Sequence, residues 1–202
     1  MYENFKYLDA VAQKEITKGV FSGSVLSVIH KGETVYLKSF GLADKEKNIP
    51  MKTDSIFRLF SMSKPVTAAA AMILIERGLF DTRHLLKWFI PEFSDPVVLD
   101  ENGERPADRD ITIGDLLTMT SGIPYPDDTP AGQKMGALWG EQSEKYLKGE
   151  KLLDTVSFAK EMGKRPLMFS PGEKWMYGAS ADIMGAVIEV VSGMKFGDFL
   201  RK

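Results

Sequence analysis

The stretch Ser61-Met62-Ser63-Lys64 places a hydroxyl and an amine three residues apart at the start of an apolar segment. Residues i and i+3 of an α-helix lie on one face, so the Lys64 amine can reach the Ser61 hydroxyl. Pro65 suits a first helical turn, and the residues from Ala68 to Ile75 are almost all apolar. We therefore expect a partly desolvated amine near the positive end of a helix dipole, and both effects lower a lysine pKa. A neutral Lys64 can take the proton of Ser61 as it attacks a carbonyl carbon.

The Ser-x-x-Lys pattern is short, and it occurs at two further places in the chain. The segment Ser157-Phe158-Ala159-Lys160 lies in a charged amphipathic stretch, which favours a solvated surface pair. The segment Ser192-Gly193-Met194-Lys195 contains a glycine typical of a helix end, so its two side chains need not share a face. For Ser61 the simpler interpretation is a helix N-cap serine followed by a solvent-facing lysine. Only the Ser61 segment combines the spacing with a helix start and an apolar helix body.

A second candidate proton carrier is Tyr177, in the run Trp175-Met176-Tyr177-Gly178-Ala179-Ser180. This run precedes an apolar-periodic helix, so we expect Tyr177 on the turn that opens it. A phenol near a lysine ammonium has its anion stabilised and can move a proton between nucleophile and leaving group. The alternative is a core tyrosine that stacks with Trp175 or packs under the helix.

Three runs, in this order along the chain, resemble the serine β-lactamase-like hydrolases. This group contains class C β-lactamases, D-alanyl-D-alanine carboxypeptidases and related bacterial carboxylesterases. The resemblance covers the chain from about Phe5 onward. The runs are Phe57-Arg58-Leu59-Phe60-Ser61-Met62-Ser63-Lys64-Pro65, Ile111-Thr112-Ile113-Gly114-Asp115-Leu116-Leu117-Thr118-Met119-Thr120-Ser121-Gly122, and Trp175-x-Tyr177 followed by Gly185-Ala186-Val187-Ile188-Glu189.

The resemblance implies an α+β fold of the β-lactamase/transpeptidase type. In it an antiparallel sheet flanked by helices stands next to a mostly helical region. It also implies a role for each matching residue. Ser61 becomes the acylated nucleophile, Lys64 becomes its base, and Tyr177 activates the leaving group or the deacylating water.

The resemblance further predicts that residues 1–202 are the N-terminal part of one catalytic domain. Residues 1–60 would form a helix and a β-hairpin, and residues 61–202 the mainly helical region. Family members continue into further strands, one of which carries a Lys-Thr-Gly-like motif and the second oxyanion-hole amide. No such triplet follows Tyr177. We therefore expect the C-terminal strands to be absent from this chain, and the chain to be a weak catalyst that self-associates or associates with the missing segment.

Ala179 stands where the lactamase and carboxypeptidase pattern has an asparagine that helps to hold a substrate amide. Its presence favours an ester substrate. The sequence thus predicts a carboxylesterase-like serine hydrolase for small molecules that forms an acyl-enzyme and needs no cofactor. The alternatives are a β-lactamase or D-alanyl-D-alanine carboxypeptidase, and a non-catalytic binding module on the same scaffold. We expect Tyr125, in an irregular Pro-rich segment, and Ala179 to be the substrate-binding positions.

Composition excludes several other classes of function. The net charge is −2 with interspersed signs, so no basic stripe is present for nucleic acid. No stretch of about 20 apolar residues is present for a membrane span. The absence of cysteine, the separation of His30 from His84 and the solvent-facing pair Asp127-Asp128 argue against a metal site. The start Met1-Tyr2-Glu3-Asn4 shows no signal peptide, which favours the cytoplasm, although a mature secreted or periplasmic form would look the same.

Local patterns predict the remaining elements. Apolar residues at helical spacing indicate the expected helices, and glycines mark their ends. Alternation of apolar and polar residues on both sides of Lys31-Gly32 indicates a β-hairpin. After Gly78 we expect a helical and loop-rich chain, with an irregular segment over 122–130 and an N-terminal capping box at Thr112-Ile113-Gly114-Asp115. The expected helices cover Asn4 to about Lys18, Ser61 to Arg77, Leu152 to Met162, Ser180 to Gly193 and Lys195 to Arg201, and the expected strands cover Val25 to Ile29 and Thr34 to Phe40.

Overall fold

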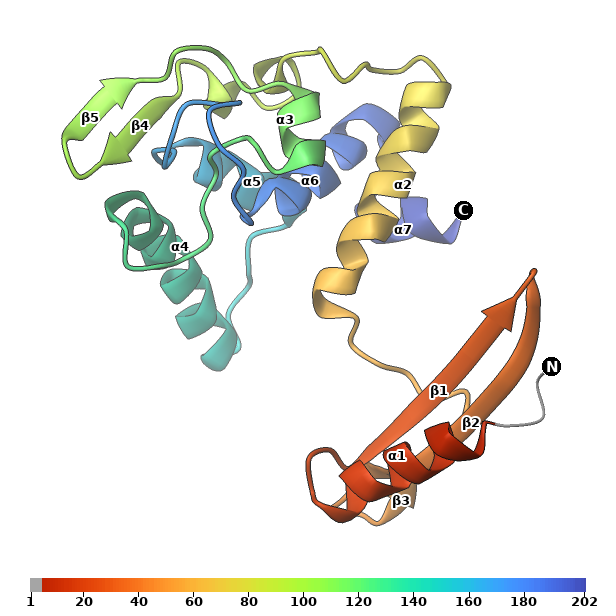
Figure 1. Cartoon of the computed structure of the whole chain (residues 1–202). Coiled ribbons are helices and arrows are strands. Elements are labelled where there is room, and N and C mark those ends of the chain that lie inside the picture. Colours follow the sequence, from red (N-terminus) through yellow and green to blue (C-terminus); the bar gives the residue numbers. More distant parts are fainter. Residues whose placement is uncertain (1–4) are drawn as a thin grey trace. The chain divides into compact units, whose positions relative to one another are not determined.

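The computed structural model describes residues 5–202, which divide into two compact units, Met1–Leu59 and Phe60–Lys202 (Figure 1). This division falls where the sequence predicted the change from the hairpin region to the helical region. That both units belong to one domain stays a prediction. The start Met1-Tyr2-Glu3-Asn4, on which the expected cytoplasmic location rests, lies outside the described residues, as does the predicted first residue of the opening helix.

The first unit is a helix with a small antiparallel sheet. Its strands β1 (Gly23–His30), β2 (Glu33–Asp44) and β3 (Ile49–Pro50) pair in the order β1-β2-β3. The predicted hairpin is confirmed, because His30 pairs with Glu33 around Lys31-Gly32. Lys31 has φ 49° and Gly32 has φ 83°, and two positive φ values in succession are what a type I′ hairpin turn requires.

Helix α1 (Lys6–Thr17) packs on the sheet through β2. The Phe5 ring lies 4.8 Å from the Tyr36 ring, measured between centroids. The Tyr36 hydroxyl donates to the Asp9 carboxylate, and the Lys38 ammonium lies 2.5 Å from the other Asp9 oxygen. Polar contacts therefore join the helix to the strand alongside the aromatic contact.

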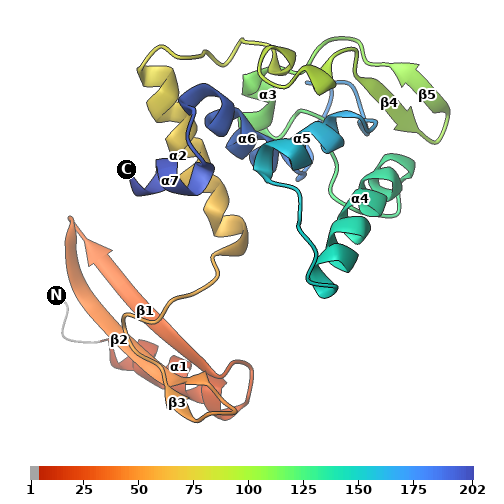
Figure 2. The same ribbon diagram turned by 180° about the vertical axis from the view of Figure 1, so that it is seen from behind.

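The second unit is mainly helical, with one two-stranded hairpin (Figure 2). Its core helix α6 (Ser180–Ser192) has Ile183, Met184 and Val187 fully buried and packs against helices on several sides. Helix α6 ends before Gly193, whose φ of 66° suits a left-handed helix end as predicted. Around α6 lie α2 (Ser63–Glu76), α3 (Ile113–Thr118), α5 (Thr155–Gly163) and α7 (Phe196–Arg201).

Three elements of this unit were not expected from the sequence. Strands β4 (Val97–Asp100) and β5 (Gly103–Pro106) form a hairpin, and the Asn102-Gly103 pair between them is a turn signal in its own right. Helix α4 (Pro130–Leu147) begins where the sequence suggested only loop. Its N-cap Thr129 accepts a hydrogen bond from the Gly132 N–H at 3.1 Å, and Pro130 occupies the first helical position.

The predicted capping box at the start of α3 is confirmed, and it extends into a larger network around Asp115. Arg109 donates two hydrogen bonds to the Asp115 carboxylate, at 2.7 and 2.8 Å. The Thr112 N–H, the Thr112 hydroxyl and the Thr120 hydroxyl donate three more. Burial raises the pKa of Asp115, but the bonds from Arg109, Thr112 and Thr120 outweigh it and leave the pKa below its ordinary value of 3.8.

We expect Asp115→Ala to lower the free energy of unfolding by roughly 1–3 kcal/mol, because it removes the capping box of α3 and leaves the Thr112 N–H without its acceptor, while the exposed Arg109 side chain can return to solvent. Chemical denaturation at neutral pH measures this change. Asp198→Ala is the matched control, since Asp198 and its partner Arg201 are both exposed and this change should leave the stability almost unaltered. Equal losses in the two variants would contradict the structural role of the network.

The same network predicts a pH dependence. A lowered native pKa means that the Asp115 contribution is fully present above the ordinary value of 3.8 and disappears as the pH falls through the native pKa. Acid titration of the folded protein should therefore show Asp115→Asn to be less sensitive than the wild type below pH 3.8. An identical acid response of the two proteins would show that Asp115 does not stabilise the fold through its charge.

Candidate active site

Ser61 lies on a 3₁₀ turn, η1 (Phe60–Met62), that leads directly into α2. The N-cap of α2 is Met62, with no side-chain capping bond, so Ser61 is not the N-cap serine of the simpler interpretation. Phe60 has φ 47°, which is rare for a bulky residue without a special reason. The backbone immediately before Ser61 is therefore strained, and strain of this kind is concentrated at functional sites.

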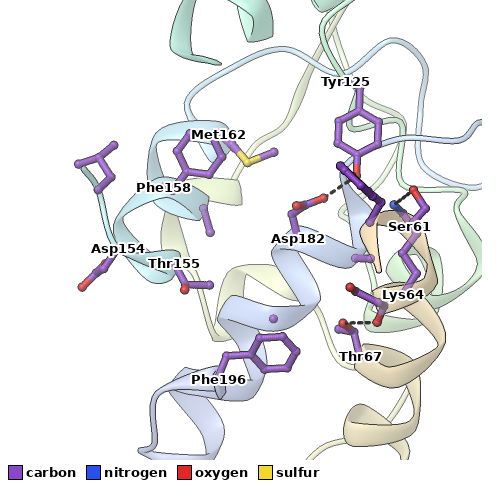
Figure 3. A pocket seen from close by; sticks show the side chains of 16 residues that line it. Ser61, Lys64, Thr67, Tyr125, Asp154, Thr155, Phe158, Met162, Asp182 and Phe196 are labelled. Atoms are coloured by element: carbon purple, nitrogen blue, oxygen red, sulfur yellow. Dashed lines mark hydrogen bonds between the residues drawn. The ribbon is translucent and has the colours of Figure 1, made fainter. Parts of the chain in front are cut away.

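Two side chains converge on the Ser61 hydroxyl. The Lys64 Nζ donates to the Ser61 Oγ at 3.2 Å, as the spacing predicted (Figure 3). The Tyr177 hydroxyl donates to the same Oγ at 2.5 Å, across 116 residues of sequence. The Lys64 Nζ also lies 4.6 Å from the centroid of the Tyr177 ring. Tyr177 is 47% exposed, so it is not the buried core tyrosine of the alternative interpretation.

The expectation of a lowered Lys64 pKa is wrong in this structure. Burial does lower the Lys64 pKa, but hydrogen bonding to Tyr177 and Tyr125 raises it by more, so the net shift is upward. The Tyr177 pKa is lowered, first by hydrogen bonding to Lys64 and then by the bond to Ser61. The amine therefore favours its charged form, and the phenol is the group whose deprotonated form is stabilised. Tyr177 donates to Ser61 in its protonated form, and it can accept the Ser61 proton once it is deprotonated beside the Lys64 cation.

Tyr125 joins this group from the irregular segment before α4. Its hydroxyl donates to the Asp182 Oδ2 at 2.8 Å, and its ring centroid lies 5.4 Å from the Lys64 Nζ and 6.1 Å from the Tyr177 ring. Burial and then the bond to Asp182 raise the Tyr125 pKa to about 12, so this phenol stays protonated. Its edge-on contact with the Trp139 ring, at 5.9 Å between centroids, helps to fix it in place.

Asp182 is the member of the group that the sequence did not predict. It lies in the first turn of α6, where a carboxylate is common because it complements the helix dipole. Nothing in the local sequence separates that ordinary role from a place in a cavity wall. Only the contact with Tyr125, 57 residues earlier in the chain, marks it.

Ser61, Lys64, Tyr125 and Asp182 share the wall of one cavity of about 520 Å³ (Figure 3). The cavity lies among α2, α5 and α6, and its size suits a small organic ligand. Apolar and aromatic side chains make up much of the rest of the wall. They are Phe60, Leu153, Phe158, Ala159, Met162, Ala181 and Phe196.

Ala179 is not brought to this wall. It is fully buried, and its N–H donates to the Ile123 carbonyl at 3.2 Å. The side chain therefore packs behind the site, and any contact with a substrate amide is left to other groups. Its assignment as a substrate-binding position stays a prediction that this geometry does not favour.

The two other Ser-x-x-Lys segments do not form serine–lysine pairs. The Lys160 ammonium lies 3.5 Å from a Glu92 carboxylate oxygen. The Lys195 ammonium lies 3.2 Å from Asp154 and 3.3 Å from Glu189, while the Ser192 hydroxyl accepts from the Met194 N–H. Among the described residues, a hydrogen bond between the serine and the lysine of this motif occurs only at Ser61.

Other kinds of site find no support in residues 5–202. In that range no group of three or more histidine, cysteine, aspartate or glutamate side chains is arranged to hold a metal ion. Asp127, considered above for a metal, accepts from the Thr129 N–H at 2.9 Å in the turn before α4. No helix in the same range has the length and apolar character needed to cross a bilayer.

Comparison with known proteins identifies the relatives of this chain. The family model described as Beta-lactamase matches residues 8–202. The chain belongs to the Beta-lactamase family. Esterase EstB from Burkholderia gladioli is 34% identical over 189 residues, which is 92% of this chain and 45% of EstB. Penicillin-binding protein 4* from Bacillus subtilis (strain 168) is 30% identical over 198 residues, which is 97% of this chain and 38% of that protein.

A solved structure of a similar protein has the same fold as this Beta-lactamase family member. EstCE1, described as a hydrolase with promiscuous acyltransferase activity, superposes with a TM-score of 0.79 at 27% identity. The match covers 97% of this chain and 49% of EstCE1. The α+β fold of the β-lactamase/transpeptidase type and the family resemblance read from the sequence are confirmed. The chain spans less than half the length of the curated relatives described here.

The electrostatics of this family member predict the titration of Tyr177. In protein labelled with ¹³C in its tyrosine rings, we expect the Tyr177 signal, identified by its absence from the spectrum of Tyr177→Phe, to titrate with a pKa below its ordinary value of 10. Lys64→Met should move that titration to higher pH, because the cation that stabilises the phenolate is gone. The matched control is Lys160→Met, which removes the lysine of a second Ser-x-x-Lys segment and should leave the titration in place. A Tyr177 titration that Lys64→Met does not move would rule out this coupling.

Proposed function

We propose that this protein is a serine hydrolase that cleaves small ester substrates through an acyl-enzyme on Ser61. The observation that carries the proposal is the pair of hydrogen bonds at the Ser61 Oγ, 3.2 Å from Lys64 and 2.5 Å from Tyr177. A hydroxyl bonded to both a cation and a phenol of lowered pKa can lose its proton as it attacks. The cavity beside it has room for the acyl and alcohol parts of a small ester.

The first step forms the acyl-enzyme. Tyr177 first loses its own hydroxyl proton to solvent, which the charged Lys64 favours. Ser61 then passes its proton to the phenolate oxygen of Tyr177 while the Ser61 Oγ bonds to the carbonyl carbon. The Ser61 N–H is the donor that we assign to the developing oxyanion. The carbon–oxygen bond of the ester then breaks, and the alcohol leaves with the proton from Tyr177.

The second step restores the enzyme. Tyr177 takes a proton from a water molecule, whose oxygen bonds to the acyl carbon. The bond from that carbon to the Ser61 Oγ breaks, Ser61 recovers a proton, and the carboxylic acid is released. An alcohol or amine in place of water would give transfer of the acyl group.

Support for an ester substrate comes from two directions. The position two residues after Tyr177 carries Ala179, whose buried methyl group supplies no hydrogen bond to a substrate amide. Among the relatives, EstB is named as an esterase and EstCE1 as a hydrolase with acyltransferase activity. Hydrolysis of β-lactams or D-alanyl peptides is the competing function, because penicillin-binding protein 4* is also similar to this chain.

Acylation by a fluorophosphonate probe tests the nucleophile. We expect mass spectrometry of the digested protein to find the probe on Ser61 and to find none in Ser61→Ala. Ser157→Ala and Ser192→Ala are the matched controls, since they remove the serines of the other two Ser-x-x-Lys segments, and both should label like the wild type. Undiminished labelling of Ser61→Ala would refute the assignment.

Rates on matched substrates test the preference for esters. We expect kcat/KM for short-chain aryl esters to exceed that for cephalosporins or D-alanyl peptides by about 10- to 100-fold, the worth of one hydrogen bond to a substrate amide. Equal or faster hydrolysis of the lactam, with Ser61 still acylated, would assign the protein to the competing function.

A further inference from the structure

Asp182 presents a carboxylate to the Ser61 cavity without an ion-pair partner. Its Oδ2 accepts from the neutral Tyr125 hydroxyl at 2.8 Å, and its side chain forms part of the cavity wall (Figure 3). No lysine, arginine or histidine nitrogen of the described residues lies within ion-pair distance of it. A carboxylate at a cavity wall attracts a cation that enters the cavity.

Two other charged groups, Asp154 and Lys64, line the cavity. Asp154 lies at the far end from Ser61, where it caps α5 through the Ser157 N–H and pairs with Lys195 at 3.2 Å. Lys64 donates to Ser61 and lies over the rings of Tyr125 and Tyr177. Asp182 is thus the carboxylate of this cavity wall that has no charged partner.

The remaining wall suits an alkylated cation. The Tyr125 and Phe158 rings, the Phe196 ring and the Met162 thioether contribute to the same cavity (Figure 3). Aromatic faces attract ammonium groups, also at solvent-exposed sites such as this one. A cavity wall that combines aromatic rings with a carboxylate is the kind of surface that binds quaternary ammonium ligands.

We propose that the cavity recognises esters that carry a quaternary or tertiary ammonium group, with Asp182 as the counter-charge and the aromatic side chains as the walls around it. This inference rests on the proposed function, because the ester would be cleaved at Ser61. It assigns to Asp182 a part in choosing the substrate, which is separate from the proton transfer by Tyr177.

An isosteric pair of esters tests the proposal. Butyrylcholine and 3,3-dimethylbutyl butyrate have nearly the same shape and differ in whether nitrogen or carbon bears the three methyl groups. For the wild type we expect kcat/KM to favour the choline ester by about tenfold or more. In Asp182→Asn the ratio of the two rates should fall close to one. Asp182→Glu, which keeps the charge, should retain a preference.

A control variant and a binding measurement complete the test. Asp154→Asn makes the same change at the other carboxylate of the cavity and should leave the ratio as in the wild type, with asparagine still able to cap α5. Calorimetric titration with choline alone should show binding to the wild type and to Asp154→Asn, and at least about tenfold weaker binding to Asp182→Asn. Circular dichroism checks that each variant is folded.

The outcomes separate this inference from the proposed function. Hydrolysis of both esters with equal kcat/KM by the wild type would overturn the inference and leave the esterase proposal standing. Choline binding that depends on Asp182, with no ester hydrolysed, would support the cation site and overturn the proposed function. A preference for the choline ester that Asp182→Asn and Asp182→Glu both retain would show that the carboxylate is not the counter-charge.

Discussion

The candidate site depends on the packing of α2 against α6. Helix α6 is buried for most of its length, so its apolar surface must be covered on several sides, and α2 provides one of those covers. The buried face of α2 includes the small residues Ala70 and Ala71, which let two helices approach closely. Ser61 and Lys64 stand at the start of α2, and Tyr177 and Asp182 stand at the start of α6. One apolar contact between helices therefore sets the distances among four polar groups.

The turn that carries Tyr177 is held from a second direction. Its neighbours bond to the segment after α3, with the Met176 N–H donating to Met119 and the Ala179 N–H donating to Ile123. A side chain at Gly178 would collide with the Ile123 carbonyl, so the two backbones lie in close contact. The same segment is tied to the buried Asp115 through the Thr120 hydroxyl. The capping network of α3 thus supports the position of the phenol, although it lies outside the cavity.

Much of this arrangement could be predicted from the sequence, because some signals are local. The spacing of Ser61 and Lys64 in a helix start and the capping box at Asp115 depend only on neighbours along the chain. Other features depend on contacts that a local pattern does not contain. The raised Lys64 pKa comes from two tyrosines of other segments, and the place of Asp182 is known only from its bond to Tyr125. Helix α4 was missed for another reason, since its glycines and the prolines before it weaken the helical pattern.

The left-handed backbone of Phe60 has a consequence for engineering. A bulky residue with φ 47° costs the fold roughly 1–2 kcal/mol, and asparagine adopts this conformation more readily. A library screened for heat resistance alone will therefore enrich Phe60→Asn, which relaxes the residue that precedes the nucleophile and removes an aromatic ring from the cavity wall. At this position a substitution that raises thermostability therefore also alters the cavity in which turnover takes place. A design campaign that scores both should hold residue 60 fixed and seek its stability elsewhere in the chain.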